Sequence, residues 1–507
     1  MRKLKNVSLQ LISFAISAIA SFIVTPILVR YVGQSLYGFV DLANTFSNYI
    51  LIITSAFNTL LGRYVSLNYL KKEYNSAISY YSSITILNIV FSVLLIIFFT
   101  VLCIFLDKII NIPVDSITNV KLLFFFIFIS FSISIMFCSF DVGTFVSNRM
   151  DLAGLKSISF TVLKYSSIFF LLKYISNDIY FVGIGTLFSM LINIIINFSM
   201  KKKLLPEIRL VKESFEINAI KNIFVVGVWN SLGQINQLLL NGLDLLLTNY
   251  FVGSLMMSIV SIGKTIPNQI ILLISTVANT FVPNMIQKYS ESKISLKKEI
   301  ILQMKLCGFI CSIPILGFVI YGDCFYHLWV GDLYKNNMID ISVVSILTLL
   351  SSLFSVYIYP LYNLFSVTCK LKIPTICNLG SGMINVIIVV AYLIFFGGEN
   401  SIYIIVGCSS IISIIRILLF VPLYSSYILN VSWQFFYIPL IRGLASSVLI
   451  SFLFITLKSM FIIDSWISLF FVAIVSALIG YLCSAMILFN KKDRIMCIQI
   501  VKEKLNV

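Results

Sequence analysis

Residues 80–106 read YYSSITILNIVFSVLLIIFFTVLCIFL, a run of 27 residues without a charged side chain. As an α-helix this run would be about 40 Å long, which is enough to cross the hydrocarbon core of a bilayer, roughly 30 Å thick. Lipid offers no hydrogen bonds to the backbone, and strands of alternating hydrophobicity are absent from the sequence. The run is therefore predicted to be a membrane-spanning helix.

Thirteen further apolar runs bring the number of predicted membrane helices to about fourteen. They cover residues 7–29, 39–62, 121–144, 158–175, 179–200, 222–251, 255–282, 301–322, 339–366, 374–397, 402–424, 436–458 and 465–489. The 507-residue chain is 59% hydrophobic and 11% charged, whereas soluble proteins are about 25% charged. The predicted fold class is an all-α integral membrane protein, and this composition disfavours a soluble enzyme.

The basic residues lie mainly on one side of the predicted helices. The chain has 36 Lys and Arg against 20 Asp and Glu, a formal net charge of +16. With a cytoplasmic N-terminus, the predicted inside segments carry 25 of the basic residues and the outside segments carry 6. The positive-inside rule then predicts a multi-pass protein with both termini in the cytoplasm. Because topology explains most of the excess charge, no nucleic-acid partner is predicted.

The longest hydrophilic stretch, residues 201–221 (KKKLLPEIRLVKESFEINAIK), separates six predicted helices from eight. It is predicted to be an amphipathic cytoplasmic linker between an N-terminal lobe, residues 1–200, and a C-terminal lobe, residues 222–424. A helix pair at 436–489 and a basic cytoplasmic tail at 490–507 follow. The end of the seventh helix, Phe251-Val252-Gly253, echoes the end of the first, Tyr31-Val32-Gly33, which is consistent with two repeats of the same orientation.

A stripe of polar residues runs along the seventh predicted helix. Asn230, Gln234, Gln237, Asn241, Asp244 and Thr248 follow at a mean spacing of 3.6 residues, which places them on one face of a continuous helix. Such a face cannot contact lipid, because each unsatisfied polar group would cost several kcal/mol there. Similar stripes occur in the first, second and eighth segments. Interhelical hydrogen bonding explains one stripe; four together predict a hydrated central cavity.

Charged residues within the predicted helices are mostly basic. Lys164, Lys264, Lys305, Arg416 and Arg442 stand against two acids, Asp141 and Asp244. Arg416 and Lys264 are predicted to face the cavity, whereas the other three lie close enough to helix ends to reach the headgroups. Asp244 is expected to pair with Lys264, with a protonation or Na⁺ site as the alternative. A cationic cavity lined by amides and hydroxyls suits a phosphate-linked glycan.

The sequence has few residues suited to catalysis, metal binding or nucleotide binding. The single histidine, His327, is predicted in an outside loop, the ten cysteines are scattered without metal-site spacing, and no glycine-rich phosphate loop follows a strand. No cofactor or metal is predicted and the protein is not expected to be an enzyme. Coupling of transport to H⁺ or Na⁺ stays open.

Four stretches of the chain resemble a known family. Residues 30–38, RYVGQSLYG, are similar to the R-x-L-G-x-x-x-Y-G signature that ends the first helix of the polysaccharide (O-antigen and capsule type) flippases. Arg63 after the second helix, residues 244–253 (DLLLTNYFVG) and Leu328-Trp329-Val330-Gly331 add to the resemblance. These flippases belong to the multidrug/oligosaccharidyl-lipid/polysaccharide exporter superfamily.

The resemblance implies a V-shaped transporter of two six-helix lobes plus a C-terminal pair, like the superfamily's multidrug exporters. It implies that a monomer in the bacterial cytoplasmic membrane moves undecaprenyl-diphosphate-linked oligosaccharide outward by alternating access, in the company of membrane lipids, a glycan polymerase and assembly proteins. Residues are assigned to three roles on this hypothesis. They are Arg30, Lys264 and Arg416 for phosphate, Asn48, Asn58, Asn230, Gln234, Gln237 and Asn241 for sugar, and Asp41, Asp244 and Arg63 for gating or ion coupling.

Three other functions remain open on the sequence. A multidrug or cation antiporter and a lipid II flippase belong to the same superfamily, although a cationic cavity disfavours a cationic drug. A membrane glycan polymerase would need catalytic side chains on an outside loop. The longest predicted outside loop, residues 323–338, offers Asp323, His327, Asp332 and Lys335 for that role.

Overall fold

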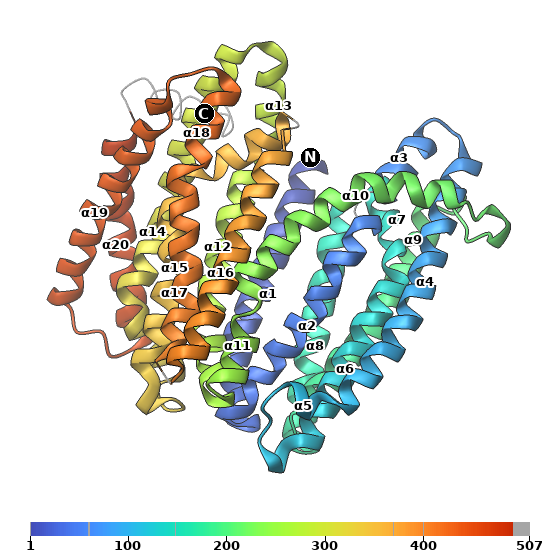
Figure 1. Cartoon of the computed structure of the whole chain (residues 1–507), viewed down its shortest axis with the longest axis horizontal. Helices are drawn as coiled ribbons and strands as arrows, with labels where there is room; N and C mark the ends of the chain where they lie inside the picture. Colours follow the sequence, from blue (N-terminus) through green and yellow to red (C-terminus); the bar gives the residue numbers. More distant parts are fainter. Residues whose placement is uncertain (1, 59–60, 148, 369, 399, 490–507) are drawn as a thin grey trace. The chain divides into compact units, whose positions relative to one another are not determined.

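The computed structural model describes residues 2–58, 61–147, 149–368, 370–398 and 400–489. Side chains are described for all of these except residues 2–8, 10, 11, 51–53, 55–57, 222, 225–230, 233, 241 and 283. Over the described residues the secondary structure is helical throughout, with short connections and no strand (Figure 1). The predicted all-α fold is confirmed, and each of the fourteen predicted segments is helical over most of its described length.

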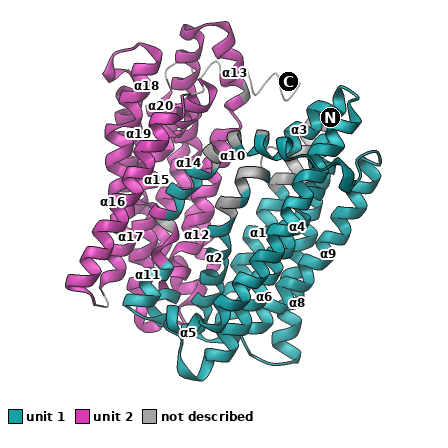
Figure 2. Cartoon of the chain, turned by 45° about the vertical axis from the view of Figure 1, so that its right-hand side comes forward, with its two compact units in different colours: residues 1–238, 245–258 teal, residues 239–244, 259–507 magenta. Residues whose placement is uncertain are grey.

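The chain divides into two compact units (Figure 2). Unit 1 comprises residues 1–238 and 245–258. Its helices are α1 (Arg2–Val32), α2 (Gln34–Asn58), α3 (Leu61–Leu70), α4 (Tyr74–Ile104), α5 (Leu106–Ile109), α6 (Ile117–Phe137), α7 (Val142–Val146), α8 (Met150–Tyr174), α9 (Tyr180–Leu204), α10 (Ile217–Gln237) and α11 (Asp244–Phe251). Within this unit α6 packs against α2, α4 and α9, and α1 packs against α8.

Unit 2 comprises residues 239–244 and 259–507. Its helices are α12 (Ser254–Asn279), α13 (Val282–Glu291), α14 (Lys293–Val330), α15 (Met338–Val367), α16 (Lys372–Phe396), α17 (Ser401–Leu419), α18 (Val421–Leu429), α19 (Tyr437–Met460) and α20 (Trp466–Leu488). The core forms where α14 packs against α15, α19 and α20. The C-terminal helix pair is thus part of this unit's core.

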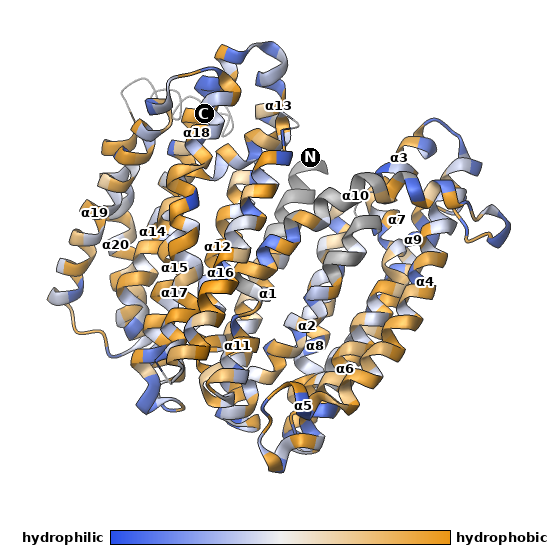
Figure 3. Cartoon of the chain, viewed as in Figure 1, coloured by the Kyte–Doolittle hydropathy of each residue, from blue (hydrophilic) through white to orange (hydrophobic). Residues whose placement is uncertain are grey.

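Twelve helical segments among the described residues are long and apolar enough to cross a membrane. Figure 3 shows hydrophobic residues along their length and hydrophilic residues toward their ends. The second and seventh predicted segments are helical but are not among the twelve.

The longest helix corrects one prediction. α14 runs over 38 residues, beyond both ends of the predicted segment 301–322. Asp323 and His327 therefore lie on a helix and not in an outside loop. The connection to α15 shortens to a few residues, and Asp323 forms an ion pair with Lys458 at 2.6 Å.

The seventh predicted helix is interrupted. α10 ends at Gln237, a π-helical turn covers Leu238–Gly242, and α11 begins at Asp244. Asn385 on α16 donates a hydrogen bond to the Leu239 carbonyl at 3.1 Å within this turn. A π turn changes the phase of the helix, so the six polar residues do not share one face. The predicted single stripe along residues 230–248 is therefore wrong.

Residues 201–221 are helical only at their two ends, in α9 and α10. After α9 ends at Leu204, the chain runs through an irregular segment with one 3₁₀ turn before α10 begins. The backbone N–H groups of Val211 and Glu216 donate to the hydroxyls of Ser82 and Ser83 on α4, at 3.0 and 2.8 Å. The segment is thus attached to unit 1, and the division between the two units falls later, at residues 238–258.

Two glycines end corresponding helices in the same way. Gly33 follows α1 with φ = 98° and Gly253 follows α11 with φ = 130°. Each N–H bonds back into its helix, and each carbonyl accepts the N–H four residues ahead, from Tyr37 and Met257. The short sequence echo at residues 31–33 and 251–253 thus corresponds to a repeated backbone geometry that favours glycine.

Replacing either glycine by alanine is expected to destabilise the protein by about 1–2 kcal/mol, because an L residue is strained at positive φ. Gly380 is the matched control. It lies inside α16, where an added Cβ would meet nothing within 4 Å, so Gly380→Ala should stabilise the protein by about 0.5–1 kcal/mol. Thermal unfolding in detergent measures both changes. Equal effects at all three positions would contradict the assignment.

Candidate functional site

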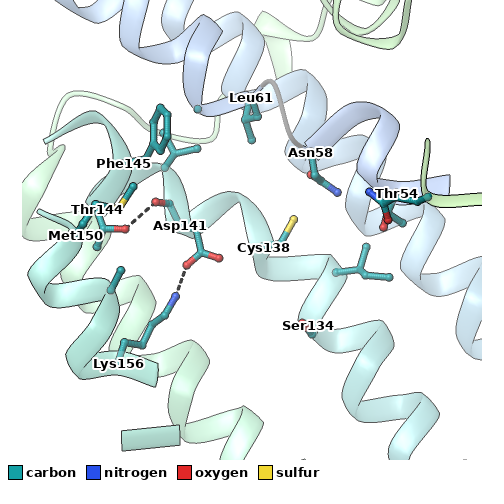
Figure 4. Close-up of a pocket in the computed structure, with 15 residues that line it drawn as sticks. Thr54, Asn58, Leu61, Ser134, Cys138, Asp141, Thr144, Phe145, Met150 and Lys156 are labelled. Atoms are coloured by element: carbon teal, nitrogen blue, oxygen red, sulfur yellow. Dashed lines mark hydrogen bonds and ion pairs between the residues drawn. The ribbon is translucent and has the colours of Figure 1, made fainter. Parts of the chain in front are cut away.

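A cavity of about 650 Å³ lies within unit 1, between α2, α3, α6, α7, α8 and α10 (Figure 4). Its walls combine amides, hydroxyls and a carboxylate with apolar side chains. They are formed by Thr54, Asn58, Leu61, Gly62, Ser134, Ile135, Cys138, Asp141, Val142, Thr144, Phe145, Met150, Ala153, Lys156 and Gln234. This size and this mixture are typical of pockets for small organic groups, including sugars.

An ion pair lines this cavity. Lys156 on α8 contacts the Oδ1 atom of Asp141, which also accepts a hydrogen bond from Asn197 Nδ2 at 2.8 Å (Figure 4). The Asp141 side chain is 54% exposed and that of Lys156 is 15% exposed. Asp141 is the single carboxylate among the described lining residues, so the paired wall carries no net charge.

A pair of amides fixes one polar group of the wall. Asn58 and Asn88 each donate an Nδ2–H group to the Oδ1 atom of the other, at 3.2 and 2.9 Å. Asn88 is fully buried on α4, and its amide also reaches Cys138 Sγ at 3.4 Å. A buried amide that lost these bonds would pay its desolvation cost, so the pair holds Asn58 at the cavity wall.

A second cavity of about 290 Å³ adjoins the first. The two share Ser134, Cys138, Asp141 and Lys156. Beyond these residues the second cavity is lined by Phe137, Phe160, Met190, Asn193, Ile194 and Asn197. The Asp141–Lys156 pair therefore forms part of the wall of both spaces.

Unit 2 contains the ion pair expected from the sequence. Asp244, at the start of α11, contacts Lys264 on α12, and the two side chains are only 4% and 10% exposed. The predicted pairing is confirmed. Because a buried charge is stable only with a partner, the ammonium of Lys264 is committed to Asp244 in this structure.

Arg416 lies on α17 in unit 2, and no carboxylate among the described residues forms an ion pair with it. Its Nη1 donates to Ser381 Oγ on α16 at 3.3 Å, and Tyr362 and Cys377 lie near the same guanidinium. Its Nε is buried and has no hydrogen-bond partner among the described residues. One donor of this guanidinium is thus buried and unsatisfied among the described residues, and a guanidinium is the group that best matches an oxyanion.

The structure brings some predicted site residues together and separates others. Asn58 and Gln234 line the same cavity in unit 1, and Asp244 pairs with Lys264 in unit 2. Arg30, Asn48, Arg63 and Gln237 are exposed outside this cavity lining, and the side chains of Asn230 and Asn241 lie outside the described residues. Asp41 is half-buried and within electrostatic range of Lys164.

Sequence reasoning missed much of the unit 1 cavity. The sequence predicts Asp141 as an acid within a membrane helix but does not indicate Lys156 as its partner. Their sequence separation gave no sign of pairing, because it depends on how α7 and α8 pack. Asn88 and Asn197 were missed because each stands alone in an apolar run. The useful signal was Asp141 itself, an acid within a predicted span.

Comparison with known proteins defines the fold class more closely. No family model matches the chain. It is 23% identical over 490 residues to the uncharacterised membrane protein EpsK of Bacillus subtilis (strain 168), covering 96% of both chains.

Solved structures of the MOP superfamily share the fold. The lipid II flippase MurJ in an inward closed conformation superposes with a TM-score of 0.67, 15% identity, and coverage of 94% of this chain and 97% of the other. An inward-facing multidrug resistance MATE family transporter superposes with a TM-score of 0.62 and 13% identity, over 84% and 98%. The chain shares its fold with these two proteins, one named as a transporter and the other as a flippase.

The Asp244–Lys264 pair predicts that removing one of the two charges destabilises the protein more than removing both. Asp244→Asn alone should destabilise unit 2 by about 3–5 kcal/mol, because it leaves the Lys264 ammonium buried without its counter-charge. Adding Lys264→Met should restore most of the loss, since no uncompensated charge then remains. Unfolding midpoints in detergent measure both. If the double variant is as unstable as the single one, the ion pair does not explain the loss.

The balanced charge of the unit 1 cavity can be probed through Cys138. In a variant that keeps Cys138 as its single cysteine, cationic aminoethyl and anionic sulfonatoethyl methanethiosulfonate should react at similar rates. Lys156→Gln should raise the cationic-to-anionic rate ratio about fivefold and Asp141→Asn should lower it about fivefold, for an interaction of ~1 kcal/mol. The ratio cancels changes in thiolate fraction. Identical ratios in all three proteins would show that Cys138 does not sense the pair.

Proposed function

We propose that this chain is a flippase that moves an undecaprenyl-diphosphate-linked oligosaccharide across a bacterial cytoplasmic membrane for surface polysaccharide biosynthesis. The fold supports the proposal, because it is shared by transporters and by a flippase of a lipid-linked sugar substrate. The resemblance of residues 30–38 and 244–253 to polysaccharide flippases narrows the cargo to a glycan.

The physical task is to carry a polar headgroup through hydrocarbon. A diphosphate and its sugars cannot cross unaided, since each unpaired charge or hydroxyl would lose its hydration. A flippase replaces that hydration with protein groups while the lipid tail stays in the bilayer. The cavity in unit 1 supplies such groups from Thr54, Asn58, Ser134, Thr144 and Gln234.

The observation that carries the proposal is the neutral, hydrogen-bonding character of this cavity. Its described carboxylate, Asp141, is paired with Lys156, so the wall offers no free negative charge to a cationic drug. Amide and hydroxyl groups exchange hydrogen bonds with sugar hydroxyls, and Phe145 offers an aromatic face. We assign the sugar contacts to Asn58 and Gln234, and keep Asn48, Gln237, Asn230 and Asn241 as proposals from the sequence.

The phosphate contacts are assigned to Arg416, Lys264 and Arg30. Arg416 has an unused donor and forms no ion pair among the described residues. Lys264 would have to exchange Asp244 for a phosphate oxygen, which would make the pair a gate that opens when substrate arrives. A ligand shifts an equilibrium only through different affinities for two states, and such an exchange supplies the difference. Asp41 and Arg63 stay proposals for gating or ion coupling.

A multidrug or cation antiporter and a lipid II flippase are the second candidates. The similarity to MATE and MurJ structures supports both at the level of the fold. A lipid-linked glycan has an anionic headgroup, whereas the cargo of a cation antiporter is positively charged. Charge reversal at Arg416 should therefore impair transport of an anionic lipid but not of a cationic drug.

The proposal includes a location and partners. The distribution of Lys and Arg along the sequence supports a cytoplasmic position for both termini. The chain is proposed to act as a monomer that delivers its glycan to a polymerase and assembly proteins in the same membrane.

Charge reversal tests the phosphate assignment. Arg416→Glu should reduce export of surface glycan at least tenfold in a flippase-deficient bacterium that depends on this chain, because it places a carboxylate where an oxyanion would bind. Arg442→Glu is the matched control. Arg442 is exposed near the start of α19, and its reversal should leave export within twofold of the parent.

Membrane abundance of both variants is measured in parallel. If both reversals export normally at equal abundance, the phosphate role of Arg416 fails. Selective loss of resistance to cationic dyes, with normal glycan, would favour the antiporter.

A further inference from the structure

A short helix stands between two membrane-length helices of unit 2. α13 covers ten residues, Val282–Glu291, between α12, which ends at Asn279, and α14, which begins at Lys293. α12 alone has 26 residues, or about 39 Å of helix, which already exceeds the hydrocarbon thickness. If α12 spans the bilayer, α13 is expected at the boundary between membrane and water.

One face of α13 is packed and another is open. Met285 is fully buried in the core of unit 2, alongside Leu296 and Ile300 of α14. Beside this packed side chain, Ile286 is 54% exposed and Tyr289 is 43% exposed, and Ile294 at the start of α14 is 67% exposed. Contact of these apolar side chains with lipid would be more favourable than their contact with water.

Lysines surround this apolar face. Lys288, Lys293, Lys297 and Lys298 lie on α13 and the first turns of α14. Only Lys288 has an ion-pair partner among the described residues, Glu291 at 2.8 Å. Figure 3 shows hydrophilic residues at this end of unit 2, near α13.

The loop between α15 and α16 adds to the same end of the unit. Asn363 on α15 donates to the Ala278 carbonyl at the end of α12 at 3.1 Å, and α13 packs against α15. Lys370 follows in that loop and Lys372 begins α16; both are exposed, and so is Leu371 between them. These segments thus contain six lysines and only two glutamates, Glu291 and Glu299, so their net charge is positive.

We propose that α13, the start of α14 and the α15–α16 loop form an interfacial site for anionic phospholipid headgroups. Ile286, Tyr289 and Ile294 enter the acyl boundary, and the lysines contact headgroup phosphates. The combination of an amphipathic helix with clustered lysines is the arrangement that binds anionic lipid surfaces. The site is distinct from the unit 1 cavity and does not depend on the cargo.

A phospholipid fits better than a soluble anion for two reasons. The lysines are spread along a rim of two helices and a loop, as suits several headgroups and not one phosphate. The exposed apolar side chains lie among them, which a soluble anion would leave in water. Glycerol phosphate, which carries the same charged group without acyl chains, separates the two.

The first experiment places α13 relative to the bilayer. Tyr289→Trp and its parent are reconstituted into phosphatidylcholine vesicles containing brominated phosphatidylglycerol or brominated phosphatidylcholine. Trp229, Trp329, Trp433 and Trp466 are present in both proteins, so the difference in emission reports residue 289. We expect the added emission to be quenched at least twofold more by the brominated phosphatidylglycerol. Equal quenching by both lipids, or no quenching, would overturn the proposal.

The second experiment tests the lysines. Replacing Lys293, Lys297, Lys298 and Lys370 by Gln in the Tyr289→Trp protein should abolish the preference for phosphatidylglycerol. The control replaces four exposed lysines of unit 1, Lys71, Lys202, Lys203 and Lys212, and should retain it. Loss of the preference in both would show a general charge effect and contradict this site. Glycerol phosphate at millimolar concentration should not relieve the quenching, and relief would assign the site to a soluble anion.

Discussion

A charge or an amide inside an apolar helix bundle is stable only when another group of the protein satisfies it. Insertion of an isolated charge near the middle of a bilayer costs about 2.5–3.5 kcal/mol on translocon scales. The structure satisfies this constraint in pairs, with Lys264 on Asp244 and Lys156 on Asp141. The amides of Asn58 and Asn88 likewise satisfy each other, through two hydrogen bonds. These pairs determine which helix faces can be polar, and the rest of each face packs as hydrocarbon.

The two units meet this constraint differently. The cavity of unit 1 is a hydrogen-bonding space whose charges are already balanced, while Arg416 in unit 2 has a buried donor with no partner among the described residues. Neutral hydroxyls need exchangeable hydrogen bonds, whereas a phosphate needs a positive charge with little competition from carboxylates. In the described wall of the unit 1 cavity, the one acid is paired with a lysine.

The helices were predictable and their interruptions were not. Long apolar runs mark membrane helices because the bilayer has a fixed thickness, and the lysine and arginine distribution predicts their direction. The π turn at Leu238–Gly242 has no such signature, because it depends on Asn385 from a helix far along the chain. The pairing of Lys156 with Asp141 was not predictable for the same reason, because it depends on how the helices pack. The Asp244–Lys264 pair was accessible because a short connection joins their helices, and Gly33 and Gly253 carry a backbone requirement that is written in the residue type.

The path of the chain between the units has a consequence for dividing the protein into fragments. α10 belongs to unit 1, residues 239–244 belong to unit 2, and residues 245–258 belong to unit 1 again. Within unit 1, Asn111 and Asn249 exchange hydrogen bonds of 2.8–3.1 Å that hold α11 in place. A break in the hydrophilic segment 205–216 would leave the first fragment without two of its own helices, which would be carried by the second. If the chain were cut there and the two halves co-expressed, the second half would supply α10 and α11 to unit 1, and this contact would hold the halves together. A cut after residue 258 would instead leave each unit with nearly all of its own helices.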